Sequence, residues 1–107
     1  MRTLYKKIDV SGTPSSPELV TDLKTQEQIG STWEFLTTSA NVKVILYSVF
    51  TDEDGTETEG QIQEITLTAD TLTLYNLPFK VSHVRCKYDD TGSAMSGILR
   101  VKATTFK

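Results

Sequence analysis

The chain has 107 residues, of which 37% are hydrophobic, and its formal net charge is -3 at pH 7. About 40 core-forming side chains are enough for one domain and too few for two. One cysteine and one histidine exclude disulfide scaffolds, zinc fingers and most histidine-based metal sites. The chain holds 17 Thr, 10 Leu, 8 Val and 6 Ile against 4 Ala, a composition that favours strands over helices.

No segment has the pattern of a signal peptide or a membrane span. The most apolar stretch, Val42 to Phe50, is interrupted by Lys43 and Ser48 and is about half the ~20 residues that a spanning helix needs. An acidic chain without a basic stripe interleaved with aromatic residues lacks the charge that neutralises phosphates. We therefore expect a protein that is not secreted and has no membrane or nucleic-acid partner.

Alternation with a period of two residues predicts strands from the N-terminus onward. Thr3 to Val10 is the first expected strand, and a loop rich in Ser, Gly and Pro follows it. Glu18 to Leu23 is open to two interpretations. Leu19 and Leu23 have helical spacing after a Ser-Pro dipeptide, but two apolar residues make a narrow stripe, and the β-branched residues between them favour strand or irregular structure.

The middle of the chain continues the pattern. Ile29 to Thr38 is predicted as a half-buried strand. Val42 to Phe50 is apolar on both faces, so that strand is expected at the centre of a sheet or against a partner. Asp52 to Gly55 ends in an Asp-Gly pair, which is typical of a hairpin turn. Strands are then predicted at Gly60 to Thr68 and Thr71 to Tyr75.

Two more strands complete the expected fold. One contains Val84, Cys86 and Tyr88 on one face, and the other contains Leu99, Val101 and Ala103. Seven or eight short strands with turns every 8 to 12 residues or so predict an all-β, antiparallel β-sandwich of jelly-roll-like form. We expect a single domain over residues 1–107, with residues 1–17 as a candidate extended N-terminal arm.

Charge is distributed unevenly along the chain. Between Lys43 and Lys80 there are seven acidic residues and no basic one, whereas residues 80–107 carry six basic and two acidic residues, a net of +4. Two interpretations remain open. These groups form solvated loop tips and strand faces, or they form complementary patches that steer assembly between subunits.

His83 and Cys86 are the only candidates for a base and nucleophile pair. A separation of three residues places them on opposite faces of a strand, so they cannot touch. We expect Cys86 to be a buried structural thiol and His83 to be a solvated or interface residue. The sequence predicts no catalytic residue, no cofactor-binding residue and no enzyme activity.

The residues from Asp52 to Thr58 imitate the alternating oxygen ligands of a calcium loop. The register fails, because Glu57 stands where the loop requires Gly and Gln63 where it requires a bidentate Glu. Calcium held in another geometry stays an alternative, and no metal ligand is assigned. Trp33, Tyr47 and Tyr75 are interpreted as core residues, with an exposed cluster that stacks on sugar rings or anchors a protein as the alternative.

Three stretches resemble small virion proteins of tailed bacteriophages. They are the strand from Val42 with its acidic Asp-Gly turn, the run from Leu77-Pro78-Phe79 to Tyr88, and the final segment from Gly92 to Lys102. The resemblance covers about residues 18 to 104. The chain departs from the pattern at the hairpin, where members often have Ser-Asn-Asp-Gly followed by Trp, whereas here the turn is Asp52-Glu53-Asp54-Gly55 and the tryptophan is Trp33.

The resemblance implies a non-enzymatic structural protein, such as a capsid decoration or other head or tail accessory subunit. It implies a homo-oligomer that binds the major capsid protein or another virion protein and is made in the host cytoplasm. The sequence does not distinguish head from tail. An alternative function is a carbohydrate-binding or host-attachment module that uses exposed aromatic residues of the same kind of sandwich.

Overall fold

A computed structural model describes residues 1–107 and contains seven antiparallel β-strands and no helix. The strands are β1 (Thr3–Asp9), β2 (Glu18–Thr37), β3 (Val42–Thr51), β4 (Glu57–Thr66), β5 (Thr73–Asn76), β6 (Val81–Asp90) and β7 (Ile98–Phe106). The predicted all-β, antiparallel class with seven or eight strands is confirmed. No helix of a length and hydropathy that would cross a membrane is present.

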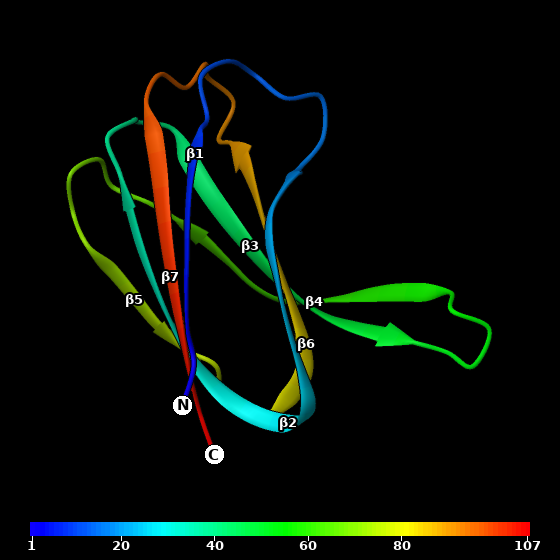
Figure 1. The fold of residues 1–107 in the computed structure, drawn as a ribbon. Helices are drawn as coiled ribbons and strands as arrows, with labels where there is room; N and C mark the ends of the chain where they lie inside the picture. The colour runs from blue at the N-terminus through cyan, green and yellow to red at the C-terminus, as the bar shows by residue number, and fades with distance from the viewer.

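The strands form two layers that share β2 (Figure 1). The first sheet has the order β5-β2-β7-β1, and the second sheet has the order β2-β6-β3-β4. The C-terminal part of β2 pairs with β7 from Gly30 to Thr37, and its N-terminal part pairs with β6 from Glu18 to Ile29. One strand therefore connects both layers of the sandwich-like fold.

The sequence predicted two separate segments where the structure has the single 20-residue strand β2. Its register against β6 shifts between Lys24 and Ile29, and a bulge of this kind bends a strand without ending it. The Thr25 hydroxyl lies at the bend and shares its one proton between the Glu27 carbonyl at 2.7 Å and the Ser82 carbonyl at 3.2 Å. The exposed polar residues of this bend interrupt the alternation, so the sequence suggested a break. The helical alternative for Glu18 to Leu23 is wrong.

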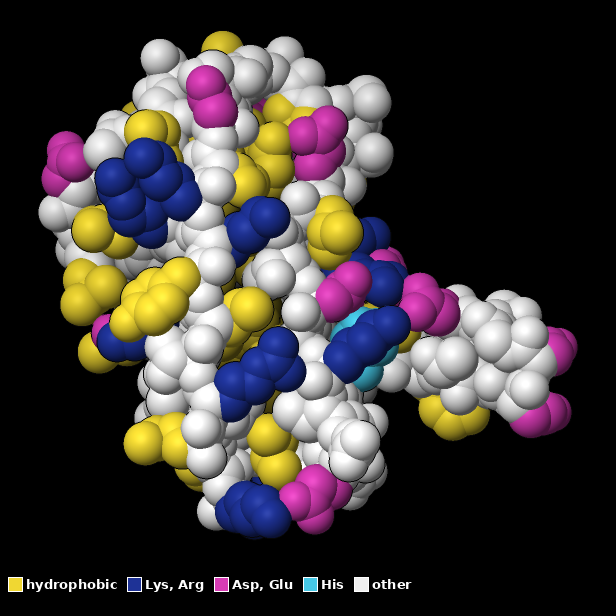
Figure 2. Space-filling model, viewed as in Figure 1, with side chains coloured by type: hydrophobic (Ala, Val, Ile, Leu, Met, Phe, Trp, Pro, Cys, Tyr) yellow, Lys and Arg dark blue, Asp and Glu magenta, His cyan; other side chains and the backbone are white.

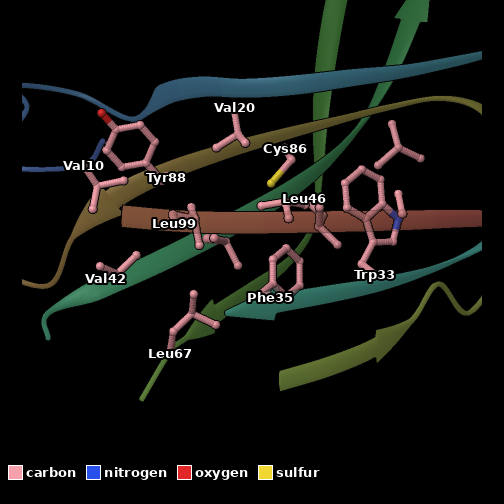
Figure 3. Packing of buried hydrophobic residues seen from close by; sticks show 14 of the residues in the cluster. Val10, Val20, Trp33, Phe35, Val42, Leu46, Leu67, Cys86, Tyr88 and Leu99 are labelled. Carbon is pink, nitrogen blue, oxygen red and sulfur yellow. The ribbon is translucent and has the colours of Figure 1, made fainter. Parts of the chain in front are cut away.

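Buried side chains from both sheets meet between the layers (Figure 3). Trp33 and Phe35 project from β2 with stacked rings whose centroids are 6.3 Å apart. They pack in one cluster with Leu46 of β3, Cys86 of β6 and Leu99 of β7, all of which are fully buried. Every buried side-chain nitrogen or oxygen has a hydrogen-bond partner. The interior is therefore a structural core in which the buried polar side chains are all hydrogen-bonded.

Strand β3 lies between β6 and β4, so the prediction of a central strand is confirmed. Its pairing with β6 stops at Ser48, and beyond that point only β4 accompanies it. Residues 49–59 therefore form a two-stranded projection, called the arm here, that extends away from the sandwich (Figure 1). At the arm's tip the Asp52 carboxylate accepts the backbone N–H groups of Asp54 and Thr56 at 3.1 and 2.9 Å.

Residues 1–17 lie against the sandwich in the isolated chain. β1 pairs with β7 over its whole length, Val10 is in the core, and Gly12 bridges to Met95. Part of the N-terminal segment, which the sequence suggested as an extension, thus forms β1, the edge strand of the first sheet.

Candidate functional site

The outer face of the first sheet carries an exposed apolar patch. Tyr5, Leu36, Leu72 and Leu74 are exposed by 71, 37, 55 and 63%. In Figure 2, hydrophobic and basic side chains lie together over the region that β5 and β7 occupy in Figure 1. A single large exposed apolar residue on a monomer is ordinary, whereas a contiguous patch marks an interaction site.

Part of this patch is hollowed into a groove of about 450 Å³. The groove is lined by apolar and basic side chains, among them Tyr5, Lys7, Leu36, Leu72, Arg100 and Lys102. The sequence analysis did not find it, because its residues come from three strands, β1, β2 and β7, and from the segment just before β5. The only available signal was the apolar side chains on the outward parity of those strands.

The register of the first sheet places the groove's basic residues. Lys102 of β7 lies between Tyr5 of β1 and Glu34 of β2, with Nζ 5.6 Å from the Tyr5 ring centroid and 3.6 Å from Glu34 Oε2. Two residues further along β1 and β7, Lys7 and Arg100 are direct cross-strand partners. Neither forms an ion pair. Like charges placed opposite each other destabilise a strand pair, so this part of the groove favours an anionic partner.

A second feature, called here the Arg85 cluster, lies on the outer face of the second sheet at the base of the arm. It consists of Asp22 on β2, Glu57 and Glu59 on β4, and His83, Arg85 and Lys87 on β6. Figure 2 shows the single histidine, in cyan, among basic and acidic side chains beside the arm.

Arg85 is the centre of that cluster. Its Nε donates to Asp22 Oδ1 at 2.8 Å, while its terminal nitrogens donate to Glu59 at 2.9 Å and to Glu57 at 3.1 Å. Burial raises the pKa of Asp22, but hydrogen bonds from Arg85 and His83 outweigh it and lower that pKa below 3.8. The pKa of Glu59 is lowered in the same way, with Arg85 and Lys87 overcoming the effect of burial.

Ion pairs within the chain account for part of the uneven charge. Three of the seven acidic residues between Lys43 and Lys80 are paired inside the chain, since Glu57 and Glu59 bind Arg85 and Glu64 lies 3.6 Å from Lys43. The acidic residues at the arm's tip, from Asp52 to Asp54, form no ion pair. Only the unpaired groups are therefore available for complementarity between subunits.

His83 and Cys86 point to opposite faces of β6, as the spacing predicts. Cys86 is fully buried in the core, and burial raises the pKa of its thiol. His83 is only 7% exposed, and its Nε2 lies 2.8 Å from Asp22 Oδ1, so of the two expected roles, solvated or interface residue, the solvated one is wrong. Neither side chain lines the groove.

The calcium alternative finds no support in the geometry of the arm's tip. The carboxylates of Asp52 and Asp54 accept backbone N–H groups of the turn, and Asp54 also accepts the Thr56 hydroxyl at 2.8 Å. No group of three or more His, Cys, Asp or Glu side chains is placed to hold a metal ion.

The three aromatic residues considered for sugar stacking do not form an exposed cluster. Trp33 is fully buried and donates from Nε1 to the Ser31 hydroxyl at 3.0 Å, and Tyr75 packs against the core. The core interpretation is confirmed for these two residues. It is wrong for Tyr47, which lies on the outer face of the second sheet with Lys87 Nζ 5.1 Å from its ring centroid.

No family model matches the sequence, and no curated protein is detectably similar to it. Solved structures do share its fold. The fold resembles one found in virus particles. A chain of the infectious bursal disease virus Gt strain matches with a TM-score of 0.59 at 13% identity, over 94% of this chain and 31% of that chain. A chain of the T13 particle of the same virus matches with a TM-score of 0.56 at 12% identity, over 94 and 30%.

A third match is YomS, a protein derived from the SPBc2 prophage. Its TM-score is 0.50 at 14% identity, and the match covers 96% of this chain and 93% of YomS. The present chain therefore spans about a third of the viral chains but nearly all of the prophage protein. At these identities the likeness establishes the fold alone.

Proposed function

We propose that this chain is a non-enzymatic structural protein of a tailed phage particle, a decoration or accessory subunit that oligomerises and binds the major capsid protein or another virion protein. The observation that carries the proposal is the exposed face of the first sheet. This face carries an exposed apolar patch of the kind that a partner protein covers, formed by Tyr5, Leu36, Leu72 and Leu74.

Two further observations support the proposal. The fold is similar to chains of a virus particle and to a prophage-derived protein of nearly the same extent. The histidine and the cysteine, which are the side chains best suited to catalysis, are committed to a hydrogen bond with Asp22 and to the core. The resemblance of residues 18 to 104 to small virion proteins points in the same direction.

The test is the composition of the particle. Phage particles produced by cells that carry the gene are purified on a density gradient, and the chain is quantified by mass spectrometry against the major capsid protein. We expect it at a fixed, stoichiometric ratio in intact particles. Its absence from particles, with the chain present in the same lysate, would refute the proposal.

A further inference from the structure

The arm and the groove carry opposite unpaired charges. Three acidic residues at the arm's tip form no ion pair: Asp52, Glu53 and Asp54. Three basic residues that line the groove form none either: Lys6, Lys7 and Arg100. The other acidic residues of the arm, Glu57 and Glu59, are already paired with Arg85. The structure thus presents three carboxylates without a cationic partner at one site and three cations without an anionic partner at another.

The arm also carries an apolar side chain that its own chain leaves uncovered. Phe50 is 68% exposed, although its parity on β3 is that of the core residues Val44 and Leu46. It is exposed because β3 has left the sandwich at that point. Alternation along the strand places Phe50 on the face of the arm opposite to Val49 and Thr51. The arm therefore offers an aromatic anchor beside an acidic tip.

The groove matches that combination. Its floor contains Tyr5, Leu36 and Leu72, and its cations include the cross-strand neighbours Lys7 and Arg100, which repel each other until an anion lies between them. An apolar anchor in a pocket with charged groups at its rim is the usual arrangement of a protein interface.

Within one chain the two features cannot meet. The arm extends from the second sheet and projects away from β1, β5 and β7, which form the outer face of the first sheet (Figure 1). Any arm that occupies a groove must therefore come from another copy.

We propose that the arm of one copy docks into the groove of the next, with Phe50 on the apolar floor and the acidic tip against Lys7 and Arg100. This inference rests on the proposed function and specifies the surfaces through which such a subunit would oligomerise. Each copy offers one arm and one groove, so two copies can exchange arms in a two-fold dimer, or the contact can repeat from copy to copy as a ring or an open chain. Arg85 serves as a positioning residue, because it binds Glu57 and Glu59 at the base of the arm.

The experiment reverses the charges on each side. The arm variant is E53K/D54K, which leaves Asp52 to hold the turn, and the groove variant is K7E/R100E, which keeps two like charges opposite each other. The matched control is K24E/K80E, because both lysines are exposed and form no ion pair. A fourth variant, Phe50→Ser, removes the anchor.

Self-association of each protein is measured by sedimentation velocity over a range of concentrations at low and high salt, and folding is checked by circular dichroism. We expect the dissociation constant for self-association of the arm, groove and Phe50 variants to be roughly tenfold higher than that of the unchanged protein. The control should have the same dissociation constant as the unchanged protein. Mixing the arm and groove variants should restore association, because each reversed surface then meets a complementary one. High salt should weaken association of the unchanged protein.

Several outcomes would overturn the inference. They are an unchanged protein that stays monomeric at low salt, variants that associate as well as the control, and a mixture that restores nothing. Particle composition tells this failure apart from failure of the proposed function. If K7E/R100E self-associates normally but is lost from particles, another virion protein occupies the groove. The arm–groove contact is then wrong while the proposed function stands.

Discussion

Asp22 and Arg85 are direct partners on β2 and β6, and the guanidinium of Arg85 joins that pair to two glutamates of the arm. The same side chain thus contacts the edge strand of the second sheet and the base of its projection. Because β3 lies between β6 and β4, these bonds join residues across four neighbouring strands, β2, β6, β3 and β4. Arg85 therefore ties the base of the arm to the sheet.

Replacing Arg85 with Met should destabilise the fold by about 1–2 kcal/mol, since three carboxylates lose their charged donor at a site where the arginine side chain is only 15% exposed. Urea unfolding measures the change, and hydrogen exchange should show faster exchange in residues 49–59. The matched control is Lys80→Met, which removes an exposed lysine without an ion pair. Equal stability of the two variants would contradict the role assigned to Arg85.

Acid should destabilise the protein partly through Asp22. Its pKa is lowered in the folded state by Arg85 and His83 against the effect of burial, so its contribution is complete above the unfolded value of 3.8 and is lost as the pH falls through the lower folded value. In Asp22→Asn the decline of unfolding free energy in that pH range should be shallower. Thermal unfolding between pH 2 and about 6 tests this. Glu53→Gln, an exposed change of the same charge, should keep the original slope.

Alkali should act through Tyr88. Its hydroxyl donates to Glu18 Oε2 at 2.7 Å, and burial together with that carboxylate raises its pKa to about 12. Stability from this group is complete below the unfolded pKa of 10.0 and is lost as the pH rises toward about 12. Tyr88→Phe should remove that loss and cost about 0.5–1.5 kcal/mol at neutral pH. Tyr5→Phe, at a residue 71% exposed, should do neither; the same alkaline loss in both variants would exclude Tyr88 as its source.

Trp33 should behave as a core residue. Trp33→Ala should cost about 3–5 kcal/mol, a large part of a typical domain's stability, because it empties the space beside Phe35. Phe79→Ala, at an exposed residue, should change the free energy of unfolding by less than about 0.5 kcal/mol. Since the alanine variant can fail to fold, fluorescence of the unchanged protein supplies a second measurement. Its emission should resist quenching by acrylamide and by added sugars; strong quenching would contradict the burial of Trp33.

Local pattern predicted most of the strands, because alternate side chains of a strand face opposite ways whatever its partners are. The Asp54-Gly55 turn also follows from local chemistry, since Gly55 adopts a φ of 90° that glycine tolerates without strain. The burial of Cys86 follows from its parity with Val84 and Tyr88. The continuity of β2 was missed because the exposed bend after Lys24 breaks the alternation that the prediction used.

The sequence by itself determined an all-β chain with an acidic hairpin turn and placed His83 and Cys86 on opposite faces of one strand. Only the tertiary structure decided which charges are free. Arg85 lies 63 residues from Asp22 and 26 from Glu59, yet all three meet on one face. Lys7 and Arg100 become neighbours only because β1 pairs with β7. Periodicity is a property of the local backbone, whereas register and pairing arise from contacts between distant strands, and it is these contacts that leave the arm's tip and the groove unpaired.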